Sequence, residues 1–126
     1  MIIIGAMVVL ALPKYTTVIE KVRASEGEQY LYSLLGAQKR YSIDHDDGLG
    51  GPDYADTVND LDIDLSATPS NFKKLTDADI NTSNPVAQIT RSDSSYTLYI
   101  SDTGIVSCNC SGVVCSTCKK LSYPDQ

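Results

Sequence analysis

The apolar residues of this chain are concentrated at its start, where residues 1–13 carry no charged side chain. From Tyr15 onward, apolar residues recur at spacings of three and four, with polar residues between them. Because this spacing places side chains on one face of an α-helix, it predicts an amphipathic helix. We therefore predict one long helix over residues 2–43, bent near Pro13 and weakened at Gly27, where glycine costs about 1 kcal/mol relative to alanine.

The apolar run over residues 1–13 is shorter than the about 20 apolar residues that a membrane-spanning helix needs. It lacks the basic residues before it, and the small-residue cleavage site after it, that mark a secretory signal peptide. A signal peptide and a buried helix of a soluble domain are the alternatives to our interpretation, in which a longer apolar helix begins upstream of Met1. The chain then divides into a projecting assembly or membrane half-helix, residues 1–27, and a globular head, residues 28–126.

Three segments of the head are predicted to be strands, namely residues 86–91, 95–100 and 105–108, because they are short, apolar or alternating, and separated by turn residues. Strands linked by short turns form an antiparallel meander, and one face of it needs an apolar cover. The expected cover is the helical stripe Tyr30, Leu31, Leu34, Leu35 and Tyr41. Residues 60–65 alternate between apolar and acidic side chains, which predicts a half-buried extended segment or an edge strand. The predicted fold class is α+β.

The composition argues against several functions. The chain has 126 residues, which fits one domain, and a formal net charge of -6. A nucleic-acid interface needs a clustered basic face, so we predict no specific nucleic-acid partner. The one histidine, His45, lies beside Asp44 and Asp46, but no serine or cysteine is placed to act as its nucleophile in a known motif. We therefore expect neither an enzymatic activity nor a cofactor.

Two groups of aspartates resemble the start of calcium-binding loops: Asp60, Asp62 and Asp64, and Asp44, Asp46 and Asp47. A calcium loop of the helix-loop-helix type also needs a glycine after its third ligand and a bidentate glutamate further on. The first group lacks this glycine, and the second lacks the glutamate. We therefore predict a solvated segment and a turn rather than a metal site.

Motifs in the predicted helix carry a family resemblance. Gly5, the run Ala11-Leu12-Pro13-Lys14-Tyr15 and the run Arg23-Ala24-Ser25-Glu26-Gly27 resemble the conserved helix of type IV pilins and pseudopilins. The predicted meander and a cysteine-bounded C-terminal loop are similar to the head of that family. The family's mature chain begins with a methylated aromatic residue followed by a glutamate, and neither is present here. The processing site and this glutamate are therefore not assigned to any residue.

The resemblance implies a structural subunit of a type IV pilus-like extracellular filament. It implies a homo-oligomer that polymerises through its apolar helix, lies in inner-membrane lipid before assembly, and reaches the cell surface through pilus or secretion machinery. The helix residues that would form the assembly interface are Ile2, Ile3, Ile4, Gly5, Met7, Val8, Val9, Leu10, Leu12, Pro13, Tyr15, Val18, Ile19 and Val22. A type II secretion pseudopilin and a membrane-anchored extracytoplasmic binding module are the alternatives.

All four cysteines lie close together near the C-terminus: Cys108, Cys110, Cys115 and Cys118. Four thiolates could bind zinc, but these pairs are closer together than those of zinc ribbons or fingers. A redox pair of Cys115 and Cys118 would need a thioredoxin-like context. Because an exported domain meets oxidising surroundings, we predict two structural disulfides. The favoured pairing is nested, Cys108–Cys118 with Cys110–Cys115, and the alternative is crossed, Cys108–Cys115 with Cys110–Cys118.

Overall fold

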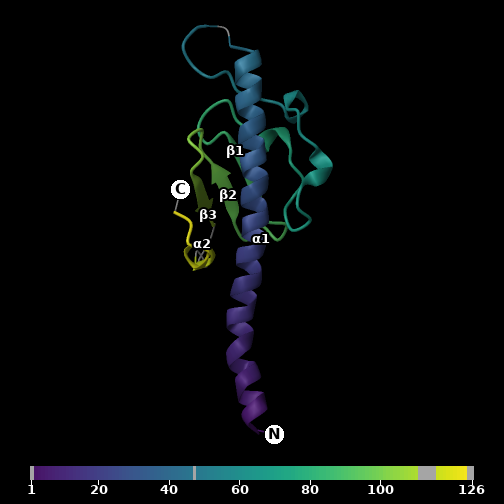
Figure 1. Ribbon diagram of the computed structural model, residues 1–126, viewed down its shortest axis with the longest axis vertical. Helices are drawn as coiled ribbons and strands as arrows, with labels where there is room; N and C mark the ends of the chain where they lie inside the picture. Colours follow the sequence, from purple (N-terminus) through teal and green to yellow (C-terminus); the bar gives the residue numbers. More distant parts are fainter. Residues whose placement is uncertain (1, 47, 111–115, 125–126) are drawn as a thin grey trace.

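The computed structural model describes residues 2–46, 48–110 and 116–124, and the side chains among them except those of residues 2–14 and 116. Its first element is the helix α1, Ile2–Asp44, which continues through Pro13 as one element. Figure 1 shows that the C-terminal half of α1 crosses a small head, whereas its N-terminal half extends well beyond that head. The long helix predicted over residues 2–43 is confirmed.

Three short strands form the sheet of the head: β1 (Ala87–Thr90), β2 (Thr97–Ile100) and β3 (Val106–Asn109). They are antiparallel in the order β1-β2-β3, and Leu98 in the central strand lies opposite Ile89 on one side and Cys108 on the other. Buried and half-buried residues alternate along β1 and β2, as expected for a sheet with one covered face. The predicted antiparallel meander is confirmed, and with it the α+β fold class.

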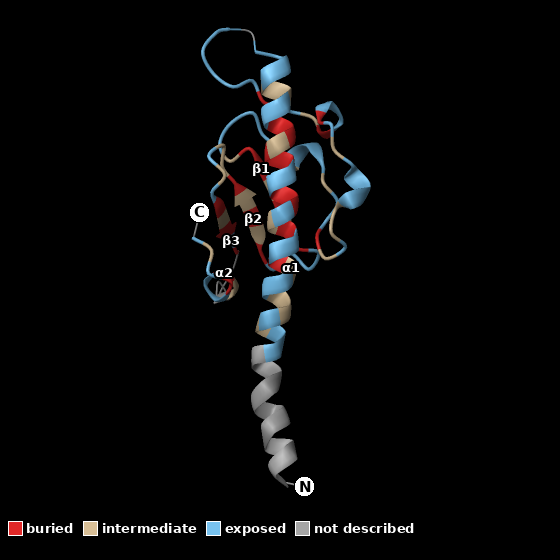
Figure 2. Ribbon diagram, in the orientation of Figure 1, coloured by how far each residue is buried: buried red, intermediate tan, exposed pale blue. Residues whose placement is uncertain are grey.

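The C-terminal half of α1 covers the apolar face of this sheet. Leu31 and Leu34 are completely buried, Tyr30 and Leu35 are nearly so, and Tyr41 is half-buried. Figure 2 shows that the buried residues of α1 lie in the part that crosses the head. Full burial of a leucine side chain contributes about 1.5–3 kcal/mol. The helical residues predicted to cover the sheet are therefore buried or half-buried, as expected.

The connection between α1 and β1 contains three short 3₁₀ turns rather than a strand: η1 (Val58–Asp60), η2 (Leu65–Ala67) and η3 (Asp77–Asp79). Residues 61–64 run as extended chain between η1 and η2, with Leu61 buried. They belong to no strand of the described sheet, so the edge-strand alternative is wrong and the half-buried extended segment is correct. The outer edge of β1 is instead occupied by two isolated bridges, Ile80 with Ala87 and Phe72 with Arg91.

One buried polar side chain joins three parts of the head. The amide nitrogen Nε2 of Gln38 donates to the carbonyl oxygens of Ala55 (3.1 Å) and Val86 (3.5 Å), and its Oε1 accepts from the backbone N–H of Ala55 at 2.8 Å. Gln38 is 0% exposed. Because a buried polar group without a partner costs about 1–3 kcal/mol, these bonds fix the rotation of α1 relative to the connection and to the start of β1.

Candidate functional site

The part of α1 that precedes the head exposes apolar side chains to solvent. Tyr15, Val18 and Val22 have exposed fractions of 63%, 56% and 57%. Successive residues of an α-helix are rotated by about 100°, so residues spaced by three and four positions share one face. We call these three residues the apolar stripe. Ile19 lies next to the stripe and is half-buried.

The other residues of the predicted assembly interface lie in the first turns of α1, and their side chains are outside the described residues: Ile2, Ile3, Ile4, Gly5, Met7, Val8, Val9, Leu10, Leu12 and Pro13. Their backbone belongs to the same uninterrupted helix as the apolar stripe. Within the part of the chain that the structure describes, no helix is both long and apolar enough to cross a membrane.

The head holds the opposite face of the same helical turns. Ala24 and Gly27 are buried, and Glu20 is half-buried. At about 100° per residue, these positions lie on the side of α1 opposite to the apolar stripe. The head therefore already contacts α1 before residue 28, at Glu20 and at Thr16 and Thr17, which line a recess with Lys120 and Leu121, while the stripe itself stays exposed.

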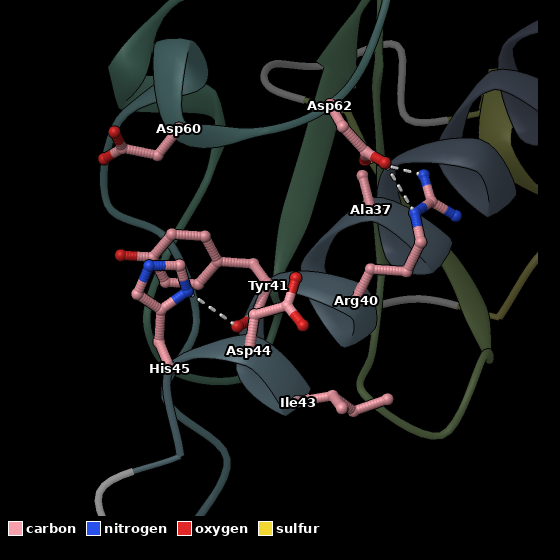
Figure 3. A pocket seen from close by; sticks show the side chains of 8 residues that line it. All are labelled: Ala37, Arg40, Tyr41, Ile43, Asp44, His45, Asp60 and Asp62. Carbon is pink, nitrogen blue, oxygen red and sulfur yellow. Dashed lines mark hydrogen bonds and ion pairs between the residues drawn. The ribbon is translucent and has the colours of Figure 1, made fainter.

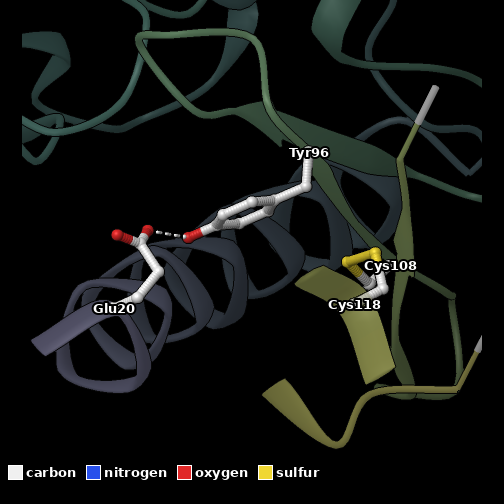
Figure 4. Close-up of a disulfide and its surroundings, with 4 residues drawn as sticks. All are labelled: Glu20, Tyr96, Cys108 and Cys118. Carbon is white, nitrogen blue, oxygen red and sulfur yellow. Dashed lines mark hydrogen bonds between the residues drawn. A yellow bond between two sulfur atoms is a disulfide. The ribbon is translucent and has the colours of Figure 1, made fainter. Parts of the chain in front are cut away.

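Two side chains of the head bind Glu20, and we call Glu20, Arg91 and Tyr96 the helix clamp. Arg91 Nε and Tyr96 Oη both donate to Glu20 Oε1, at 2.9 Å and 2.8 Å. Figure 4 shows the Tyr96 ring extending from the sheet toward Glu20 on α1. Arg91 also donates to the carbonyl oxygen of Asn71, and only 8% of its side chain is exposed. The clamp therefore ties the helix to the end of β1 and the start of β2.

The protonation states of the helix clamp follow from its contacts. Burial raises the pKa of Glu20, but the hydrogen bonds from Arg91 and Tyr96 and the positive charges of Arg91 and Arg23 outweigh it, so this pKa lies below its ordinary value. Burial and the hydrogen bond to Glu20 raise the pKa of Tyr96 well above that of a free phenol. At neutral pH the clamp therefore joins a carboxylate to a guanidinium group and a neutral phenol.

Gly27 admits an aromatic ring against the backbone of α1. A Cβ atom at this position would lie 2.5 Å from Cζ of Phe72, which is closer than real carbon contacts. The Phe72 ring is itself fixed, because Phe72 is 5% exposed and packs edge-to-face on Tyr96 with ring centroids 6.3 Å apart. Gly27 was expected only to weaken the helix, whereas the structure shows that the packing of Phe72 requires it.

The disulfide between Cys108 and Cys118 joins β3 to the short helix α2, Ser116–Leu121, with the two Cα atoms 5.6 Å apart (Figure 4). This bridge confirms one half of the nested pairing and excludes the crossed pairing. Cys110 is also disulfide-bonded, and Cys115, its predicted partner, lies outside the described residues. Because Cys108 and Cys118 are bonded to each other, neither offers a thiolate to zinc or pairs with Cys115.

A recess of about 270 Å³ lies at the C-terminal end of α1 and is lined by Ala37, Arg40, Tyr41, Ile43, Asp44, His45, Asp60 and Asp62. Figure 3 shows the His45 ring lying flat against Tyr41, with ring centroids 4.0 Å apart. His45 Nδ1 is hydrogen-bonded to the carbonyl oxygen of Tyr41 at 3.0 Å. Neither serine nor cysteine is among the described residues that line this recess.

Within the described part of the chain, no group of three or more His, Cys, Asp or Glu residues could hold a metal ion. The predicted aspartate groups have other contacts. Asp62 accepts two hydrogen bonds from Arg40, at 2.7 and 2.8 Å, and Asp64 accepts one from the backbone N–H of Ser66 at 2.9 Å. Asp47 lies outside the described residues.

Comparison of the chain with family models, with curated proteins and with solved structures finds no match. A functional proposal therefore rests on the geometry of α1 and the head, together with the sequence motifs of the helix.

Proposed function

We propose that this chain is a pilin-like structural subunit that polymerises through α1 into a type IV pilus-like extracellular filament. One observation carries the proposal: the apolar stripe is exposed on the face of α1 opposite to the face that the head holds. Exposed apolar surface costs about 25 cal/mol per Å² in water. The stripe is therefore expected to be covered by lipid or by another helix, and the motifs around Pro13 and over residues 23–27 favour the helix of a second copy.

In this proposal the α1 helices pack together inside the filament and the heads form its outer surface. All copies have the same polarity, because a contact between two different surfaces that does not close into a ring gives an open helical polymer. Before assembly, the first turns of α1 lie in inner-membrane lipid, and assembly machinery transfers the subunit to the cell surface. The role is structural, with neither a catalytic residue nor a cofactor.

The experiment that tests the proposal replaces Val18 and Val22 by aspartate. We expect electron microscopy of the sheared cell-surface fraction to show filaments for the wild type and none for V18D/V22D. Because the helix clamp and Gly27 lie on the other face of α1, the head of this variant is expected to unfold at the same urea concentration as the wild type. Lys21→Asp, on the same turns but outside the apolar stripe, serves as the matched control and should retain filaments.

Two outcomes would contradict the proposal. Filaments of normal yield from V18D/V22D would show that the apolar stripe is not an assembly surface. A wild-type chain that stays monomeric in the membrane fraction would show that α1 is only an anchor, which is the arrangement of a membrane-anchored binding module.

A further inference from the structure

The charges of this chain are distributed unevenly along its long axis. Residues 39–64 hold eight of the sixteen acidic residues and two of the ten basic residues, which gives this segment a net charge of -6, equal to that of the whole chain. The remaining acidic and basic residues balance one another. The described residues of this segment, 39–46 and 48–64, form the C-terminal end of α1 and part of the chain that follows it, at the end of the head farthest from the start of α1 (Figure 1).

Four carboxylates of this segment gather around the recess beside Tyr41 and His45. Asp44 and Asp60 line the recess, and Asp53 and Asp56 are exposed in the chain that follows α1. Burial and the negative charges of Asp60, Asp53 and Asp56 raise the pKa of the Tyr41 hydroxyl group. Figure 3 shows Asp44 projecting from the last turn of α1 beside the stacked rings. We call Asp44, Asp53, Asp56 and Asp60 with this recess the acidic end.

The charges of the acidic end are not neutralised within the head. The guanidinium group of Arg40, which lines the recess, is paired with Asp62 through two hydrogen bonds. Among the residues whose side chains the structure describes, none forms an ion pair with Asp44, Asp53, Asp56 or Asp60. Asp60 accepts a hydrogen bond from the hydroxyl group of Thr57 at 2.6 Å, which does not change its charge. The acidic end therefore presents four exposed, uncompensated carboxylates.

The opposite end of the head carries exposed lysines. Lys119 and Lys120 occupy the last turn of α2, and Lys120 lies beside Thr16 and Glu20 of α1. Lys73 reaches the turn between β1 and β2, where its Nζ lies 2.6 Å from Oγ of Ser94. Figure 1 shows α2 at the end of the head nearest the projecting half of α1. We call Lys73, Lys119 and Lys120 the basic end, and none of the three forms an ion pair within the described residues.

We propose that the acidic end of one copy docks on the basic end of a second copy, with Lys119 and Lys120 of the second copy at the recess beside Tyr41 and His45. This inference rests on the proposed function, because parallel α1 helices displaced along a common axis bring the upper end of one head toward the lower end of another. When parallel subunits lie in register, like charges face each other, whereas a displacement along the common axis brings an acidic end toward a basic end. Among parallel arrangements, the charge distribution therefore favours the displaced one.

The first test measures self-association of the purified full-length chain in detergent micelles by analytical ultracentrifugation. The micelles cover the apolar helix, so the contacts that remain are those between heads. We compare about 0.01 M and about 1 M salt, where the Debye length falls from about 30 Å to about 3 Å. Self-association at low salt is expected to weaken about tenfold or more at high salt, since ion pairs at exposed sites are screened.

The second test changes the charge of each end separately: the first double substitution brings the acidic end from -4 to 0, and the second brings the basic end from +3 to -1. Asp44→Lys with Asp60→Lys changes the formal net charge from -6 to -2, and Lys119→Glu with Lys120→Glu changes it to -10. Each variant alone is expected to associate about tenfold more weakly than the wild type at low salt. The first variant is informative because its lower net charge would favour non-specific association, which is the opposite of the expected result.

Mixing the two variants provides the matched control. In an equimolar mixture, the unchanged basic end of the first variant can dock on the unchanged acidic end of the second, so association should recover toward the wild-type value. Urea unfolding of each variant confirms that the head is still folded. A mixture that associates no better than either variant alone, or a wild type that does not associate at low salt or is insensitive to salt, would overturn the inference.

These outcomes are separable from those of the proposed function, which is scored by filaments on cells. If filaments require Val18 and Val22 but both charge variants still form them, the docking of the two ends is overturned and the filament proposal stands. If the mixed variants associate again but the wild type forms no filaments on cells, the filament proposal is overturned and the docking of the two ends stands. The alternative is that a divalent cation occupies the recess. Association at low salt would then not depend on Lys119 and Lys120, and this result would also contradict the inference.

Discussion

The carboxylate of Glu20 on α1 accepts a hydrogen bond of 2.8 Å from the hydroxyl group of Tyr96, although the two residues are 76 positions apart in the chain. Arg91, whose side chain is 8% exposed, donates to the same carboxylate oxygen at 2.9 Å. The helical turn that enters the head is therefore held to the sheet by a polar contact, and its other face stays exposed.

Replacing Glu20 by glutamine is expected to destabilise the head by about 1.5–3 kcal/mol, since Arg91 would keep its charge in a nearly buried place without its counter-charge. The measurement is urea unfolding of the full-length chain at neutral pH. Glu26→Gln, at an exposed position on the same helix, is the control and should change stability by less than about 0.5 kcal/mol. Equal effects of the two substitutions would show that the helix clamp contributes nothing specific.

The pH dependence of stability has a defined sign. The pKa of Glu20 is lower in the folded chain than its ordinary value of 4.5, so the unfolded chain binds more protons in acid. The stability that this residue contributes is present above pH 4.5 and is lost as the pH falls through the folded-state pKa. Asp62, Asp64 and Asp93, whose pKa values are also lowered, act with the same sign.

Because several carboxylates act together, the informative quantity is the difference in unfolding free energy between the wild type and Glu20→Gln. We expect this difference to be largest near neutral pH and to shrink as the pH falls below 4.5 and through the lowered folded-state pKa, where Glu20 becomes protonated in both states. A difference that stays constant over this range would show that the charge of Glu20 is not what stabilises the contact.

Alanine at Gly27 is expected to destabilise the head, although alanine normally stabilises a helix by about 1 kcal/mol relative to glycine. The added Cβ atom would overlap the buried Phe72 ring, and overpacking of this kind costs about 1–3 kcal/mol. Gly36→Ala is the matched control on the same helix, because its nearest neighbour is the flexible Arg40 side chain at 3.4 Å. Thermal unfolding should show a lower Tm for Gly27→Ala and an unchanged or higher Tm for Gly36→Ala.

The outcome for Gly27 can be checked further with a second substitution. Phe72→Leu shortens the side chain that meets the new Cβ atom. It should therefore lower the free energy of unfolding less in the Gly27→Ala background than in the wild type. Additive effects of the two substitutions would contradict the close contact between them.

The sequence predicted those features that depend on neighbouring residues. The spacing of Leu31 and Leu34 is enough to identify the buried face of α1, because helical periodicity is local. The alternation along residues 60–65 also predicted burial correctly at Leu61. It could not predict whether the segment pairs with the sheet, since that depends on Ile80 and Phe72 already occupying the edge of β1.

The polar contacts of the head were not predicted, and the reason is their long range. Glu20 and Arg91 are 71 positions apart, and nothing near either residue distinguishes it from a solvated surface charge. Gln38 likewise interrupts the apolar face of α1 and reads as an exposed position, although it is completely buried. For Gly27, the sequence shows only a glycine within a helix, which indicates lower helix stability. It does not show that the Phe72 ring packs against the backbone there.

Removing the bridge with Cys108→Ser and Cys118→Ser is expected to lower the unfolding free energy by about 2–3 kcal/mol, which is the chain-entropy value for a loop with this sequence separation of 10. Urea unfolding without reductant is the measurement. The wild type treated with reductant should lose at least as much, because every bridge is then opened. A double variant as stable as the wild type would show that α2 is held by its packing alone, through buried residues such as Leu121.

Glu20 and Gln38 attach α1 to the head at two heights, separated by about 27 Å of helix at 1.5 Å per residue. A single attachment would allow the head to swivel about the helix, whereas two attachments this far apart resist both tilting and axial slip. A tensile load along α1 would therefore be shared by the contacts of Glu20 and Gln38 with the head. It would act on these contacts as a shear force, parallel to the helix axis. We therefore expect the helix and the head to turn together, so that a rotation of α1 about its own axis moves the outer surface of the head by the same angle.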